Sequence, residues 1–431
     1  MIKLRSALSC LSIALFLAFN TEAEEISPQK LEAALAELRE LQRIQADTAE
    51  RIAALEDMLN ADMIASAPIS VAPSSSPPDA IEPAPIDMAF PATSPLNVTA
   101  DMMVRFEGNY GGSLPDRERG VMRARLGATY QVDPRLKVGA LLETGDPDDP
   151  NSGYLTFDEF TDDFTVSLSR AYMEYQIGAL TLSGGKFPKP FRSTDLLWDG
   201  DVNPSGLAIR TGVDLTESVR LDLSGLASII DENASGADSH MIGGQTALSA
   251  ELPTGLQLAF ALGYYDYELN SLAGADAGDF LNNLLTPNGE YLSDFDLLDL
   301  IVTLEWLAWS EEWPVWLTIN YVENLGAEVS ADRATGIDLG IGRSASPGDL
   351  KFMYGYAEAG VDSVLGAFSH DNYALSTNYM SHELGVHYLL TDRIWLGGSL
   401  YHYKPLDAQY AGRFVPDEWH DRLRLNIGVA F

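Results

Sequence analysis

The chain has 431 residues, of which 46% are hydrophobic and 21% charged, and its 63 Asp and Glu against 27 Lys and Arg give a formal net charge of −36. This excess of negative charge excludes nucleic-acid binding, which needs basic surface to neutralise phosphates. No internal stretch approaches the roughly 18 to 20 uncharged apolar residues of a membrane-spanning helix, so a polytopic helical membrane protein is also excluded.

Residues 1–23 have the pattern of an export signal, because Lys3 and Arg5 precede an apolar stretch that ends near a small residue, Ala23. Such a segment is removed at export. The single cysteine, Cys10, lies inside it, so the predicted mature chain has no thiol for a disulfide, a metal site or a nucleophile. A lipoprotein attachment at Cys10 is the weaker alternative, since the apolar stretch continues beyond it.

Residues 24–64 are predicted to form a periplasmic helix that assembles as a short coiled coil. Ser27 is a candidate helix cap, Pro28 suits the first helical position, and the following residues contain no Gly as far as residue 62. Apolar residues then recur at heptad spacing. The two seams are Leu31, Leu38, Gln45, Ile52 and Leu59, and Ala34, Leu41, Thr48 and Leu55. We expect self-association as a trimer; the alternative is a single helix lying on another surface.

Residues 65–97 are predicted to be an extended linker. They contain eight prolines and the run Ser74-Ser75-Ser76, a composition that buries almost no apolar surface. The linker would separate the helix from the domain that follows.

From residue 98 to 431 the sequence alternates between apolar and polar residues. Met102, Val104 and Phe106 would face one side, and Arg105 and Glu107 the other, which is the period of a β-strand with unlike faces. The sixteen candidate strands are 99–110, 119–132, 136–143, 164–177, 179–186, 206–213, 218–230, 240–250, 255–267, 296–307, 314–323, 334–343, 350–360, 375–389, 393–403 and 421–431.

The connections between these strands alternate in length, and every second one is short. Short turns at one end and long loops at the other are typical of an outer-membrane barrel with an even number of strands. A soluble sandwich has no reason to sort its loops in this way. The pattern therefore predicts an all-β transmembrane fold, an antiparallel β-barrel of about 16 strands.

The last strand supports this interpretation. Leu423, Leu425 and Ile427 alternate with polar or small residues up to the terminal Phe431. An amphipathic final strand that closes on an aromatic residue resembles the signal read by the outer-membrane assembly machinery, so Phe431 is the candidate assembly signal.

The most distinctive motif lies at 184–208. It reads Gly-Gly-Lys-Phe-Pro-Lys-Pro-Phe at 184–191, Thr-Asp-Leu-Leu-Trp-Asp-Gly-Asp-Val-Asn at 194–203 and Gly-Leu-Ala at 206–208. This segment and the layout of the chain resemble a family of bacterial proteins described as putative porins, over about residues 98–431. The resemblance implies a pore and names no particular solute.

The resemblance also implies a constriction, because the third outer loop of 16-stranded porins commonly folds into the lumen, and the motif occupies that connection at 187–205. The expected pore-lining residues are Arg105, Arg123, Arg125, Lys186, Lys189, Arg192, Asp195, Asp199 and Asp201. Facing charges of opposite sign would set up a transverse field that orients charged solutes. The alternative is that the prolines and aromatic residues only shape the loop while its acids cap turns.

Other kinds of site are weakly indicated. Residues 199–203 begin like a calcium loop, but Pro204 stands where Gly is needed. The six histidines show no ligand spacing, and no Gly-x-Ser-x-Gly motif is present. We expect no enzymatic activity, no cofactor and no bound metal; loop acids that bind divalent ions are an alternative.

The sequence therefore predicts a porin of a Gram-negative outer membrane, through which small hydrophilic solutes or ions diffuse passively. A substrate-selective channel and a structural tether between outer membrane and peptidoglycan are the alternatives. The expected partners are outer-membrane lipid and lipopolysaccharide, the assembly machinery, further copies of the chain in a homotrimer, and peptidoglycan through the N-terminal helix.

Overall fold

The computed structural model describes residues 95–147, 149, 152–157, 163–270, 272, 281–307, 313–411 and 415–431. The predicted export signal and coiled coil, and almost all of the Pro-rich linker, lie outside the described residues. Everything below concerns the part of the chain that follows them.

Sixteen strands of 7 to 15 residues form one antiparallel sheet. They are β1 (Leu96–Tyr110), β2 (Arg117–Gln131), β3 (Leu136–Thr144), β5 (Val166–Ile177), β6 (Leu180–Lys186), β7 (Ser205–Thr216), β8 (Val219–Asp231), β9 (Ser239–Glu251), β10 (Leu256–Glu268), β11 (Phe295–Trp306), β12 (Val315–Asn324), β13 (Arg333–Gly342), β14 (Leu350–Ala359), β15 (Tyr379–Leu389), β16 (Ile394–Pro405) and β17 (His420–Ala430).

Three shorter elements accompany them. The two-residue strand β4 (Leu155–Thr156) pairs with β2, and the 3₁₀ helices η2 (Gly366–Phe368) and η3 (Ala408–Tyr410) lie in connections. Among the described residues, no helix has the length and apolar character needed to cross a membrane.

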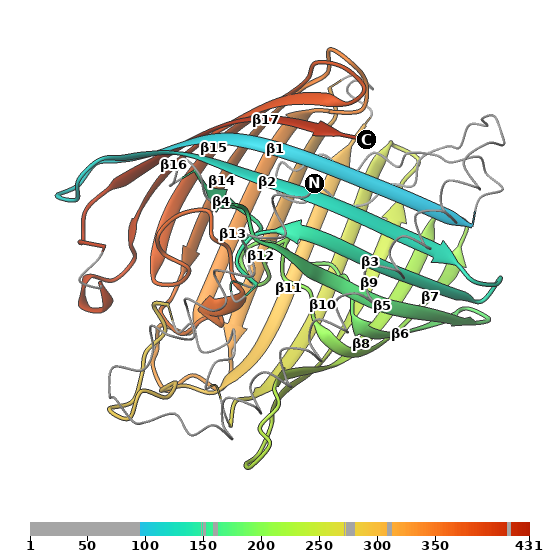
Figure 1. Cartoon of the computed structure of the whole chain (residues 1–431), viewed down its shortest axis with the longest axis horizontal. Coiled ribbons are helices and arrows are strands. Elements are labelled where there is room, and N and C mark those ends of the chain that lie inside the picture. Colours follow the sequence, from blue (N-terminus) through green and yellow to red (C-terminus); the bar gives the residue numbers. More distant parts are fainter. Residues whose placement is uncertain are drawn as a thin grey trace, which may run out of the picture. The chain divides into compact units, whose positions relative to one another are not determined.

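The sheet closes on itself. Each of the sixteen strands pairs with the next along the chain, and β1 pairs with β17, where Met103 lies opposite Gly428 (Figure 1). Beyond β17, Phe431 exchanges two backbone hydrogen bonds with Ala100, both of 2.8 Å. Closure removes free strand edges, which is what a sheet in a bilayer requires. The prediction of an antiparallel barrel of 16 strands is confirmed.

The strand positions match those expected from the alternation, with one larger difference at β15. This strand begins at Tyr379, whereas the sequence suggested residue 375. Asn378 adopts a φ of 50°, which interrupts the extended conformation, and the residues before it belong to a buried loop. The two-residue strand β4 has too little alternation to be predicted.

The two faces of the sheet differ as the alternation predicts. On β1, Glu107 is 1% exposed while its neighbour Phe106 is 38% exposed, and on β17 Arg424 is buried while Leu425 is half exposed. Outward positions on the other strands carry large apolar side chains as well. The barrel therefore has an apolar exterior and a polar interior, the arrangement of outer-membrane barrels.

Long connections gather at one end of the barrel, and two of them fold inward. The first inner loop is residues 187–204, between β6 and β7, and the second inner loop is residues 360–378, between β14 and β15. Most side chains of the second loop are fully buried. The resemblance to porins predicts an inward position for the first loop, whereas the alternation of connection lengths predicts an ordinary outer loop at 361–374, which the structure corrects.

Candidate functional site

The base of the first inner loop depends on two glycines. Gly185 and Gly206 lie opposite each other across β6 and β7, with φ values of 112° and 152°. A Cβ atom on Gly185 would lie 2.3 Å from the carbonyl oxygen of Ala171, and one on Gly206 would lie 2.2 Å from that of Ala227. Only glycine permits this approach of the backbones, so part of the distinctive motif sets where the loop leaves the wall.

The first inner loop then crosses to the opposite wall. The backbone N–H of Arg192 donates to Oε1 of Gln245 on β9 over 2.9 Å, and Thr194 contacts Asn320 on β12 through its hydroxyl. The ring of Phe191 lies 5.2 Å from that of Trp198 and 4.9 Å from that of Tyr265 on β10. Apolar packing on one side of the loop leaves its acidic residues on the other side.

The second inner loop packs against the first inner loop and forms a hydrogen bond with it. Nδ2 of Asn372 donates to Oδ2 of Asp195 over 3.3 Å, and the ring of Phe368 packs 6.1 Å from that of Trp198. The carboxylate of Asp362 accepts bonds from Ser293 Oγ and from the backbone N–H of Leu284, which ties this loop to the long connection between β10 and β11. The two loops thus form one packed unit inside the barrel.

A row of arginines lies on the facing wall, on β1, β2 and β17. Arg105 donates to Oδ1 of Asn426 over 2.8 Å and to the hydroxyl of Tyr154 over 2.9 Å, and its guanidinium also stacks on the Tyr154 ring. Arg424 forms an ion pair of 2.9 Å with Glu107, which is almost fully buried. Tertiary contacts therefore hold these cations in one orientation.

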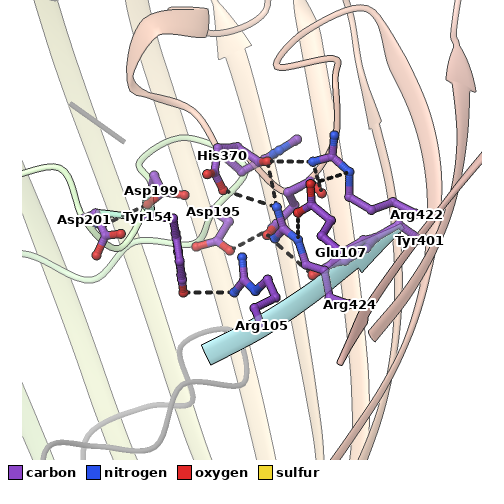
Figure 2. Close-up of polar contacts among 12 residues, drawn as sticks. Arg105, Glu107, Tyr154, Asp195, Asp199, Asp201, His370, Tyr401, Arg422 and Arg424 are labelled. Carbon is purple, nitrogen blue, oxygen red and sulfur yellow. Dashed lines mark hydrogen bonds and ion pairs between the residues drawn. The ribbon is translucent and has the colours of Figure 1, made fainter. Parts of the chain in front are cut away.

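The acids of the first inner loop face this wall across a cavity of about 330 Å³. Figure 2 shows Asp199 and Asp201 on the loop, opposite Arg105 and Arg424 on the strands. Asp201 Oδ1 lies 3.5 Å from Nη1 of Arg125, so the two sets of charges meet directly at one edge. Opposite charges on facing walls of a lumen produce a transverse field.

Five of the nine predicted site residues line this cavity: Arg105, Arg125, Asp195, Asp199 and Asp201. Arg123 is buried beside it, with its Nη1 3.8 Å from Asp201 Oδ1. Lys186 lines a neighbouring cavity of about 200 Å³.

The remaining two predicted cations hold the loop in place. Lys189 donates to the carbonyl oxygens of Trp198 and Asp199 over 3.0 and 2.7 Å, and Arg192 donates to the hydroxyl of Ser249 over 2.8 Å. Neither belongs to the lining of the larger cavity.

Several lining residues escaped the sequence analysis: Tyr154, Arg170, Asp371, Asn372 and Arg424. Arg424 lies on the polar face of the last strand, and barrel closure next to β1 is the signal that could have identified it. Asp371 and Asn372 lie in the second inner loop. The apolar residues Val361, Val364 and Leu365 are the sequence signal that indicates burial of this loop.

Burial changes the ionisation of two groups in the inner loops. Burial raises the pKa of the Asp199 carboxyl well above its usual range, and the nearby carboxylates of Asp195 and Asp201 raise it further. Burial lowers the pKa of His370 to about 3, so this imidazole is neutral at neutral pH. Among the described residues, no group of three His, Cys, Asp or Glu is placed to hold a metal ion.

Comparison with known proteins finds one matching family model and several solved structures of similar fold. Residues 80–278 match a family model described as "Putative porin". OprB of Pseudomonas putida, in its high-pH structure, is 14% identical over 78% of this chain and 94% of that chain, with a TM-score of 0.50. The anion-selective porin from Comamonas acidovorans is 14% identical over 78% of this chain and 99% of that chain, with a TM-score of 0.46.

A loop L8 deletion mutant of OmpT from Vibrio cholerae is 12% identical over 78% of this chain and 100% of that chain, with a TM-score of 0.46. No curated protein matches the sequence. At these identities the similarity to OprB shows the fold alone, and function has to be argued from the site.

Proposed function

Because this chain is a porin-like outer-membrane β-barrel whose residues 80–278 match the family of putative porins, we propose that it lets small hydrophilic solutes or ions diffuse passively across a Gram-negative outer membrane. The family is one of channels and not of enzymes. Solutes would move down their gradients through the polar interior, with the long loops outside the cell and the short turns in the periplasm.

The observation that carries this proposal is the pair of opposed charged walls. Asp195 and Asp201 on the first inner loop face Arg105 and Arg424 across a cavity lined by both signs of charge. A small polar solute that passes between these walls would replace part of its hydration shell with contacts to the charged side chains. Its dipole would align with the field. We propose that residues 187–204 form the constriction.

The net charge bears on ion selectivity. Residues 98–431 contain 21 Lys and Arg against 49 Asp and Glu, a balance of −28. Acidic residues concentrate cations near a pore and repel anions, whereas the arginine wall opposes this effect at the neck. We propose that the channel prefers cations and that the first inner loop contributes to this preference.

Single-channel recording of the full-length protein in planar bilayers tests the proposal. We expect stepwise conductance in KCl and a reversal potential that indicates preference for cations. Replacing three acids together, as Asp195→Asn, Asp199→Asn and Asp201→Asn, should reduce that preference, while Asp392→Asn in an exposed turn should not. Recordings without stepwise conductance would overturn the channel proposal and favour a structural tether. An unchanged preference in the triple variant would overturn the placement of the constriction.

The assembly state is part of the same proposal. The heptad pattern within residues 24–64 supports a homotrimer, in which the helix and the linker extend into the periplasm and contact peptidoglycan. Native mass spectrometry of the purified protein should show a trimer, and deletion of residues 24–97 should lower its stability while leaving unit conductance unchanged. A monomer in native mass spectra of the full-length protein would refute the proposed homotrimer.

A further inference from the structure

A second, smaller cavity of about 100 Å³ lies between the first inner loop and the wall formed by β12 to β15. Three carboxylates line it: Asp195 from the loop, Asp338 from β13 and Glu383 from β15. Its described lining contains no Lys or Arg. This cavity is therefore chemically unlike the larger one, whose lining has several arginines.

The strand register brings two of these carboxylates together. Asp338 lies opposite Gly355 on β14, and Gly355 lies opposite Glu383. A Cβ atom on Gly355 would lie 2.9 Å from Asp338 Oδ1 and 3.8 Å from Glu383 Oε2. Since glycine has no side chain, the space above it is left to the two carboxylates, which converge there from either side.

Two side chains that line this cavity have buried polar atoms without hydrogen-bond partners in the described part of the chain. The imidazole of His370 lines it, is 3% exposed, and has no hydrogen-bond partner for Nδ1 or Nε2 among the described residues. The indole Nε1 of Trp316, which also lines it, is likewise buried without a partner. Unpaired buried polar atoms are costly, so native proteins satisfy them through a ligand or water.

Aromatic rings complete the walls. Tyr373, Tyr379 and Tyr401 line the cavity, and the ring of Tyr373 lies 5.1 Å from that of Tyr379 and 5.9 Å from that of Tyr401. Carboxylates together with the faces of aromatic rings form the usual environment for organic ammonium groups, because both attract a cation and the rings also accept its carbon atoms.

We propose that this cavity, the acidic pocket, binds the ammonium group of small organic cations that pass through the barrel. A primary ammonium has three N–H donors, and Asp195, Asp338 and Glu383 supply acceptors for them. The pocket shares Asp195, Asn372, Glu383 and Tyr401 with the larger cavity, so a bound cation would reach it from the lumen. The inference rests on the proposed channel function and assigns it a class of preferred solute.

Current block by propylammonium tests the acidic pocket. Recordings of the full-length protein in KCl should show that propylammonium reduces the potassium current in a saturable way. The neutral propanol and the anion propionate should not. The double variant Asp338→Asn and Glu383→Gln should weaken the block about tenfold or more.

A matched control removes two negative charges outside the lumen. Asp392→Asn with Glu217→Gln changes exposed residues in turns and should leave the block unchanged. Equal weakening in this control would show that total charge, and not the pocket, attracts the cation. Heat-modifiable migration in SDS gels shows whether each variant still folds.

Binding measured by calorimetry separates this inference from the channel proposal. One outcome supports the pocket and overturns the channel proposal. In it, propylammonium binds the detergent-solubilised protein and binds the double variant at least tenfold more weakly, while neither protein conducts potassium. If the protein conducts potassium but propylammonium neither binds nor blocks, the pocket is overturned and the channel stands. Block that persists undiminished in a folded double variant also overturns the pocket.

Discussion

The backbone N–H of Asp199 in the first inner loop donates a hydrogen bond of 2.9 Å to the carbonyl oxygen of Phe368 in the second inner loop. The side chain of Asp199 lines the large cavity, and the ring of Phe368 packs against Trp198 on the opposite side of the same loop. The position of the acidic residues in the first inner loop therefore depends on contacts with the second inner loop, which lies far along the chain.

Removing the Phe368 side chain from the second inner loop should widen the lumen and make the first inner loop more mobile. Phe368→Ala removes a buried ring that packs against Trp198 and Tyr267, and large-to-small changes of this kind cost about 3 to 5 kcal/mol. We expect a larger mean conductance with more current noise, together with lower resistance to urea in detergent micelles. Phe352→Ala, which removes a ring exposed on the exterior of β14, should leave the conductance unchanged. Equal noise in both variants would contradict the supporting role of the second loop.

The ion pair between Arg424 and Glu107 should contribute more to stability than exposed pairs do. Arg424→Gln leaves Glu107 buried with a weakened set of partners, and loss of one member of a buried pair costs roughly 3 to 5 kcal/mol. The residual pairing of Glu107 with Arg119 should reduce the effect to the lower end of this range. Urea titration of the barrel measures it.

An exposed ion pair provides the comparison. Arg333→Gln breaks the contact of 2.9 Å with Glu323 at the loop end of β13, where the arginine is largely solvent-accessible, and should lower the unfolding free energy far less than Arg424→Gln does. Similar values for Arg424→Gln and Arg333→Gln would show that the interior of the barrel is as well solvated as its rim.

Cation preference should increase with pH because of Asp199. The raised pKa of this carboxyl means that it is neutral below that value and gains its negative charge only as the pH rises through it. Reversal potentials measured over a range of pH should therefore shift towards cations on the alkaline side, and Asp199→Asn should remove part of the shift. A pH dependence that is identical in the variant would place the titrating group elsewhere.

Acid should weaken the second inner loop through His370. Its pKa is lowered by burial to about 3 from an ordinary 6.5, so above pH 6.5 the folded and unfolded chains are both neutral at this group. Below 6.5 the unfolded chain takes up a proton that the folded chain cannot, and stability is lost progressively as the pH falls towards 3. Between about pH 7 and pH 5 the loss is about 2 kcal/mol.

The variant His370→Gln should lose less stability over the same pH range, because glutamine does not titrate. His240→Gln, which changes an exposed imidazole beside Glu268, should keep the full pH dependence of the unmodified protein. Urea unfolding in micelles at the two pH values gives the comparison, and equal losses in the unmodified protein and His370→Gln would exclude His370 as the source.

Local sequence patterns determined most of the barrel. Alternation with a period of two, as between Glu107 and Phe106, specifies both a strand and the face that meets lipid, since successive side chains point to opposite sides of a sheet. The alternation of short and long connections then indicated an even number of strands. The glycines and prolines around residue 187 marked the place where one loop leaves the wall.

Only the tertiary structure decided how the interior is filled. Barrel closure brings Arg105 on β1 to within 2.8 Å of Asn426 on β17, and it places Arg424 in the same wall. The inward course of the second inner loop likewise depends on space left between distant strands and on partners such as Trp198. Alternation acts between neighbouring residues along one strand, whereas these contacts join residues that are neighbours only after the whole sheet has curved and closed.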